Sequence, residues 1–256
     1  MLPTPDTSHV EFERIYEPAE DSFLLLDTLS SAAETAFLRD RFGSRSDAAG
    51  PAPVPPPFVV EIGPGSGVVI GFINAHASVI FGSRDVLTAA VDVNSHACRA
   101  TRETARKAAA DNAASHGMYL DALQGDLVAP LRPGSVDVLV FNPPYVPTEE
   151  LPRQPAADHE GGGDKQPTFD HDSYLLSLSY AGGRDGMETT DRLIDALPET
   201  LSPRGCAYVL LCAQNRPEEV KERIRGFGRQ WRAETVGSSG KKAGWEKLQI
   251  IRIWRE

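Results

Sequence analysis

Cysteine is scarce in this chain of 256 residues, which holds only Cys98, Cys206 and Cys212. Three cysteines so far apart cannot build a disulfide framework, and the histidines stand at no spacing that would complete a zinc site with them. We therefore expect three small core residues in a reducing compartment, and no metal site.

Long apolar stretches are missing as well. No run approaches the roughly eighteen residues that a membrane-spanning helix needs. Residues 1–10 are polar and contain prolines, whereas a secretion signal has a basic segment followed by an apolar one. The sequence thus predicts a cytoplasmic location, with the nucleus as the alternative.

Basic residues are few relative to acids: 26 lysines and arginines stand against 36 aspartates and glutamates, for a net charge of −10. This balance opposes nonspecific attraction to a polyphosphate, so a nucleic-acid partner would need a local basic patch. Arg99, Arg102, Arg106 and Lys107 recur at helical spacing, but no aromatic residues interleave with them, which favours a solvated helix face. We expect no direct contact with nucleic acid.

The composition is otherwise ordinary for a globular protein, with 41% hydrophobic and 24% charged residues. Apolar runs alternate with helical patterns along the chain, and two extended segments follow each other at the end. This order predicts an α/β fold: a seven-stranded, mostly parallel Rossmann-like sheet with helices on both faces and an antiparallel C-terminal hairpin. The expected strands are 58–62, 86–91, 119–124, 136–141, 206–212, 231–236 and 247–254, and the expected helices are 18–29, 68–73, 95–114, 174–180, 187–201 and 217–225.

Two segments interrupt this pattern. Between Arg39 and Pro57 the chain is rich in Gly, Ser, Ala and Pro, which predicts a linker. What precedes it is too short to bury its own core, so we expect residues 1–57 to form an N-terminal helix and Pro-rich linker packed on a catalytic domain of residues 58–256. Residues 148–169 contain three consecutive glycines and predict either a substrate-gating loop or an insertion with a disordered middle.

A glycine turn follows the first expected strand. Residues 63–67 read Gly-Pro-Gly-Ser-Gly and lead into a helix. Alternate glycines let the backbone turn sharply and approach a ligand closely. The turn resembles the dinucleotide fingerprint without matching it, so by itself it is a weak signal.

Polar residues follow the other expected strands. Asp92 ends the second strand at about the distance at which an acid binds ribose hydroxyls, and Asp126 follows the third. Because the carboxyl ends of parallel strands meet at one edge of the sheet, these acids should converge with the glycine turn and Asn142 in one crevice.

The tetrapeptide Asn142-Pro143-Pro144-Tyr145 follows the fourth strand. Two consecutive prolines make the loop stiff. The side-chain oxygen of Asn142 and the backbone oxygen of Pro143 could accept both hydrogens of an –NH2 group, while the Tyr145 ring stacks on the plane that carries it. This pattern suits either an amide or a nucleobase amine.

Four stretches together resemble the HemK-like glutamine methyltransferases, which use S-adenosylmethionine (SAM) to modify translation release factors. The match is best with the eukaryotic and archaeal branch, and Pro64 is a departure at a position where a smaller residue is usual. The stretches are 16–26, 61–69, 142–146 and 181–186.

The resemblance implies SAM as cofactor, the glutamine of the Gly-Gly-Gln loop of the class-I release factor as substrate, and a small zinc-binding activator as obligate partner. The short strand 119–124 is an expected sheet edge that a partner could extend. Glu61, Gly63 and Gly65 would shape the cofactor pocket, Asp92 would bind the ribose, Asp126 and Leu127 the adenine, and Ser22 the methionine end. The implied sites are Ser22, Glu61, Gly63, Gly65, Asp92, Asp126, Leu127 and Asn142 for the cofactor, and Asn142, Pro143, Pro144 and Tyr145 for the substrate, with Asn142, Pro143 and Tyr145 catalytic.

Three other functions stay open from the residues alone. An adenine or cytosine amino-methyltransferase would use the same loop, although the acidic balance disfavours it. A protein lysine methyltransferase acting on histone would not need a loop suited to a planar group. A non-enzymatic SAM-binding scaffold would have no use for stiff acceptors at the methyl site.

Overall fold

The computed structural model describes residues 2–43, 55–153, 169–240 and 247–256. The middle of the expected Pro-rich linker, the middle of 148–169 and the hairpin residues 241–246 lie outside the described residues.

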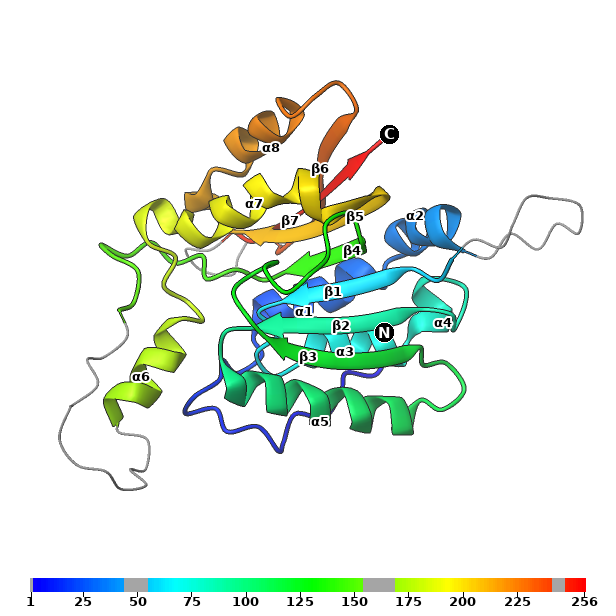
Figure 1. Cartoon of the computed structure of the whole chain (residues 1–256), viewed down its shortest axis with the longest axis horizontal. Coiled ribbons are helices and arrows are strands. Elements are labelled where there is room, and N and C mark those ends of the chain that lie inside the picture. The colour runs from blue at the N-terminus through cyan, green and yellow to red at the C-terminus, as the bar shows by residue number, and fades with distance from the viewer. Residues whose placement is uncertain (1, 44–54, 154–168, 241–246) are drawn as a thin grey trace, which may run out of the picture.

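The described residues form one seven-stranded sheet in the order β3-β2-β1-β4-β5-β7-β6 (Figure 1). Neighbouring strands from β3 to β5 run parallel, while β7 runs antiparallel to both β5 and β6. The predicted fold class is confirmed. The strands are β1 (Phe58–Ile62), β2 (Leu87–Asp92), β3 (Met118–Gln124), β4 (Val136–Phe141), β5 (Leu201–Leu211), β6 (Trp231–Ser238) and β7 (Gln249–Arg255).

Helices cover both faces of this sheet. Alternate side chains of β4 show why: Val138 and Val140 pack in the core with the N-terminal helices, and Leu139 and Phe141 in the core with α7 and α8. The helices are α1 (Glu20–Leu29), α2 (Ala32–Phe42), α3 (Val68–Ala75), α4 (Ala77–Ile80), α5 (Ser95–Asp111), α6 (Phe169–Ser177), α7 (Glu188–Thr200) and α8 (Pro217–Arg225), with 3₁₀ turns at Arg184–Gly186 and Ala213–Asn215.

Several element boundaries differ from expectation. Helix α1 begins at Glu20, so Pro18 lies before it. Helix α5 begins at Ser95 as expected but ends at Asp111 instead of residue 114, and its N-cap is Asn94, whose side chain accepts a hydrogen bond from the His96 N–H at 2.9 Å. Strand β5 begins already at Leu201, because a register shift against β4 accommodates Pro203, which cannot donate a ladder hydrogen bond.

Helix α2 was not expected, although the sequence carries a start signal for it. Ser31 accepts a hydrogen bond from the Glu34 N–H at 3.2 Å, which is half of a capping box. The Glu34 side chain turns inward, where its carboxylate accepts from the Tyr208 hydroxyl at 2.7 Å and from Arg252 at 2.8 Å. This buried ion pair ties the N-terminal helices to β5 and β7.

The N-terminal helices therefore pack directly on the main sheet, while the boundary at residue 57 stays a prediction. Within the described ranges, no helix combines the length and the apolar character needed to cross a membrane.

Candidate active site

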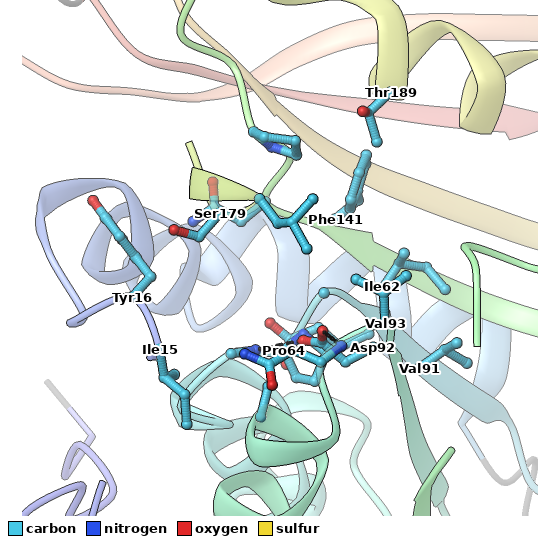
Figure 2. A pocket seen from close by; sticks show the side chains of 18 of the residues that line it. Ile15, Tyr16, Ile62, Pro64, Val91, Asp92, Val93, Phe141, Ser179 and Thr189 are labelled. Atoms are coloured by element: carbon cyan, nitrogen blue, oxygen red, sulfur yellow. Dashed lines mark hydrogen bonds between the residues drawn. The ribbon is translucent and has the colours of Figure 1, made fainter. Parts of the chain in front are cut away.

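One pocket opens at the carboxyl ends of β1, β2 and β4 (Figure 2). In Figure 2, Asp92 and Pro64 lie at its base, with Ile15 and Tyr16 on one side and Phe141 above. All eight residues predicted to bind the cofactor line this pocket. Of the residues predicted for the substrate, Asn142 and Pro144 line it, whereas Pro143 and Tyr145 do not. The eight are Ser22, Glu61, Gly63, Gly65, Asp92, Asp126, Leu127 and Asn142.

The glycine turn joins β1 to α3 and packs against α5. Gly67 adopts a φ of +77°, and a Cβ there would stand 2.6 Å from the Thr101 Cα of α5. Only glycine allows the turn to approach α5 this closely. Pro64, at the position where the resemblance leads one to expect a smaller residue, is buried and lines the pocket without disturbing the turn.

Two buried carboxylates form the base of the pocket. Asp92 accepts hydrogen bonds from the N–H groups of Asn94 at 2.8 Å and Gly65 at 3.2 Å, and Glu61 accepts from the Ile70 N–H at 2.8 Å. Burial raises the pKa of Asp92 to about 6. Burial, with a contribution from the charge of Asp92, raises the pKa of Glu61 to about 8. Such strongly shifted acids in a cleft are typical of functional sites.

Asp126 and Leu127 stand at the rim. The Asp126 carboxylate is exposed and accepts from Arg192 of α7 at 2.5 Å. Leu127 adopts a φ of 49°, a strained conformation for a branched residue, which fits a constrained position at a site. Arg192 also lines the pocket. It was not predicted, because only the folded structure shows that it lies close to Asp126.

The side-chain amide of Asn142 has a defined environment. Its Nδ2 donates to Asp21 Oδ2 at 3.0 Å, while its Oδ1 is buried and has no hydrogen-bond partner among the described residues. Asp21 lies in the first turn of α1 and is 3% exposed. Because a buried acceptor without a partner is costly, this oxygen is a ready acceptor for a ligand.

The predicted turn 181–186 supports the loop that carries Asn142. The Val146 N–H donates to the Tyr180 carbonyl at 2.9 Å, and the Gly182 N–H donates back to Val146 at 2.8 Å. Asn215 is buried and its Nδ2 donates to the carbonyls of Tyr145 at 3.1 Å and Asp185 at 3.0 Å. Asn215 was not predicted from the sequence, where its only local signal is that it precedes the start of α8.

Two segments outside the sheet contribute to the lining of the pocket. Arg14, Ile15 and Tyr16 approach from the N-terminal side, and Leu175 and Leu178 from in and after α6. Arg14 Nε lies 2.9 Å from Asp172 Oδ1, which joins the two segments by an ion pair. Tyr16, the first residue of the stretch 16–26, lines the pocket together with Ser22.

The fold and the site together define a class I methyltransferase. The sheet order, the glycine turn with acids at the next strand ends, and an Asn-Pro-Pro-Tyr loop beside them are the parts that such an enzyme needs. No cluster of His, Cys, Asp or Glu in the described part of the chain could hold a metal ion.

Comparisons with known proteins identify the family, although no family model matches the chain. The chain is 35% identical to Methyltransferase HEMK2 of Mus musculus, over 98% of this chain and 96% of that protein. It is 33% identical to the eRF1 methyltransferase catalytic subunit mtq2 of Schizosaccharomyces pombe, over 100% and 96%. A chain of the E. cuniculi Mtq2–Trm112 complex shares the fold, with a TM-score of 0.54, 24% identity, and coverage of 95% of this chain and 99% of that one.

The chain belongs to the HEMK2/Mtq2 family of eukaryotic HemK-like methyltransferases. This membership and the fold imply that it uses SAM.

Proposed function

We propose that the chain is the catalytic subunit of a heterodimer that methylates the side-chain amide nitrogen of the glutamine in the Gly-Gly-Gln motif of the class-I release factor. One observation carries the proposal: the buried, unpartnered Oδ1 of Asn142 at a pocket that also holds the acids and glycines of a cofactor site. The names of the relatives, an eRF1 methyltransferase subunit and the Mtq2–Trm112 complex, agree with it.

The residues present fit SAM. Asp92, Asp126, Leu127 and Ser22 all line the pocket. In this proposal Asp92 would accept two ribose hydroxyls, Asp126 and Leu127 would hold the adenine, and Ser22 would bind the methionine end. When bound, SAM supplies a methyl group on a positively charged sulfur, which is already a good leaving group.

Asn142 then acts on the substrate amide. An amide nitrogen is a poor nucleophile because its lone pair is delocalised, so the enzyme must hold it in line and favour electron density on nitrogen. Asn142 Oδ1 does both by accepting a hydrogen bond from the –NH2 group. In this proposal the Pro143 carbonyl accepts the second hydrogen and Tyr145 stacks on the amide plane. The nitrogen gives up one hydrogen as a proton, which passes to water.

The direct test is transfer of a labelled methyl group. The chain, with and without the activator, is incubated with labelled SAM and with release factor, release factor whose motif glutamine is replaced, histone, or nucleic acid. We expect label only on the intact release factor. Label on the glutamine-replaced factor, on histone or on nucleic acid instead would reject the proposal in favour of the corresponding substrate.

A first prediction concerns Asp92. Replacing it with alanine removes two charge-assisted hydrogen bonds to the ribose, and also the acceptor that holds the Gly65 N–H, so SAM affinity should fall about a hundredfold. Calorimetric titration measures this. Asp85→Ala is the matched control, since Asp85 is an exposed acid just before the opposite end of β2 and should leave the affinity unchanged.

The pH dependence of SAM affinity should follow the same carboxylate. Since the pKa of Asp92 is raised to about 6, the cofactor-free chain holds a proton there at lower pH, and binding must displace it. The protonation of Asp92 should therefore leave SAM affinity unchanged above pH 6. Below pH 6 it should lower the affinity by up to about tenfold per pH unit. Titrations between pH 5 and 7 on wild type and Asp92→Asn test this. An unchanged decline in the variant would assign it to another group.

The proposed partner is a small zinc-binding activator, and the edge strand β3 is its docking strand. β3 is the outermost strand of the sheet, as Figure 1 shows, so one side of its backbone faces no strand among the described residues. Met118 and Leu120 are 61% and 50% exposed, which is unusual for large apolar side chains on a strand. An added strand would pair the backbone and cover these side chains.

Leu120→Asp should therefore weaken activator binding by about a hundredfold or more, because a charge would be buried unpaired at the new interface. Co-purification and calorimetry measure the loss. Val79→Asp changes another exposed apolar residue, on α4, and should bind as wild type does. We also expect the isolated chain to be poorly soluble or to bind SAM weakly. A monodisperse isolated chain with tight SAM binding would make the partner dispensable for folding.

A further inference from the structure

We propose that Asp21 is a positioning residue that fixes which way the Asn142 amide faces. This inference rests on the proposed function, because it explains how Asn142 can present an acceptor to a substrate –NH2 group. It assigns a role in the reaction to the first turn of α1, a segment remote in sequence from the loop.

An asparagine side chain can sit in two orientations of almost the same shape. One orientation places Oδ1 toward the substrate, and the other places the Nδ2 donors there. A substrate –NH2 group offers donors only, so the second orientation sets donor against donor and cannot hold it. The enzyme therefore needs some feature that makes the two orientations unequal in free energy.

Asp21 supplies this asymmetry. Its Oδ2 lies 3.0 Å from Asn142 Nδ2, and a carboxylate oxygen only accepts hydrogen bonds. Turning the amide over would place Asn142 Oδ1 against Asp21 Oδ2, two acceptors in contact, at a position where Asp21 is 3% exposed. Burial makes this mismatch costly, because water cannot relieve it.

The carboxylate is itself held in place. Asp21 Oδ1 accepts from the Ser22 N–H at 2.6 Å and from the Ser22 hydroxyl at 3.2 Å, which leaves Oδ2 to face Asn142. Both residues belong to the first turn of α1, where a negative charge is favoured by the helix dipole. The hydrogen bond to a charged acceptor also polarises the Asn142 amide and makes Oδ1 a stronger acceptor.

The test exchanges the two groups. Asp21→Asn keeps the shape but allows both orientations of Asn142, so kcat should fall about tenfold or more while SAM affinity stays within about twofold. Asn142→Asp sets two carboxylates against each other and should lose more. In the double variant Asp21→Asn with Asn142→Asp, the new amide donates to the new carboxylate and one oxygen remains for the substrate. Its kcat should exceed that of Asn142→Asp by at least about tenfold.

All measurements use the full chain with its activator. A double variant no more active than Asn142→Asp, or an Asp21→Asn variant with wild-type kcat, would overturn the role of Asp21 while leaving the proposed function standing. Lack of wild-type activity on the release factor would instead overturn the proposed function.

A second readout needs neither activity nor a stable Asp21 variant. In a sample labelled with ¹⁵N-asparagine, the Asn142 –NH2 signals are assigned by their loss in Asn142→Ala. One of the two protons should be shifted downfield and protected from solvent exchange by the bond to Asp21. Exchange of both protons at the rate of a free amide would contradict the proposal.

Discussion

Asn142→Ala is expected to lower turnover by about a thousandfold, to the limit of detection, while SAM affinity stays within about threefold. The variant removes the acceptor that holds the substrate nitrogen, and removal of a single preorganised hydrogen-bonding group of this kind costs about 10²–10³ in kcat. Cofactor affinity should survive, because the ribose and adenine residues, Asp92 and Asp126, lie on other strand ends. Single-turnover methylation and calorimetry separate the two effects.

Asn112→Ala provides the control for this variant. Asn112 is a partly exposed asparagine at the end of α5, where it donates to the Ala108 carbonyl at 2.9 Å, and it does not line the pocket. Its replacement should leave both kcat and SAM affinity near wild type. If Asn142→Ala kept more than about a tenth of wild-type turnover, the loop would not hold the substrate amide as proposed.

The sequence was informative about this site wherever a residue acts through its position in a strand or turn. Asp92 and Asn142 each follow an apolar strand, and the carboxyl ends of parallel strands must meet, so their convergence followed from periodicity alone. The expected edge strand 119–124 is β3, which lies at one end of the strand order.

Residues that act through a partner far along the chain could not be found in this way. Asp21 bonds a residue 121 positions away, and its local signal, an acid in the first turn of a helix, is explained equally well by the helix dipole. Asn215 bonds the Tyr145 carbonyl across 70 positions. Such pairs depend on how α1 and the 3₁₀ turn after β5 pack against the loop, which no local pattern specifies.

Glu34 illustrates a different limit. Its position three residues after Ser31 predicts a capping box, but its side chain pairs with Arg252 and Tyr208 in the core instead. The cap pattern marks the start of α2, a helix that was not predicted, and it does not indicate where the carboxylate goes.

Gly186→Ala should combine a loss of stability with a loss of activity of about a hundredfold or more. Gly186 has a φ of +69°, and a Cβ there would stand 2.0 Å from the Tyr145 carbonyl oxygen and 2.7 Å from Asn215 Nδ2. Both contacts are far too short, so the Asn-Pro-Pro-Tyr loop would have to move away from the turn, taking the bond from Asn215 with it. A displacement of about 1 Å at a reacting group can cost about a hundredfold in rate.

Gly134→Ala isolates the part of this effect that comes from the backbone alone. Gly134 has a φ of +66°, and a Cβ there meets nothing within 4 Å. It should lose about 1–2 kcal/mol of unfolding free energy, the cost of a left-handed conformation, with wild-type kcat. Denaturant unfolding and kcat are measured for both variants. A Gly186→Ala variant that matched Gly134→Ala in both would mean that the turn does not position the loop. The two variants share the same backbone cost. A larger loss of kcat in Gly186→Ala would therefore show that Gly186, 41 residues after Tyr145, holds the loop that carries the Asn142 acceptor in place.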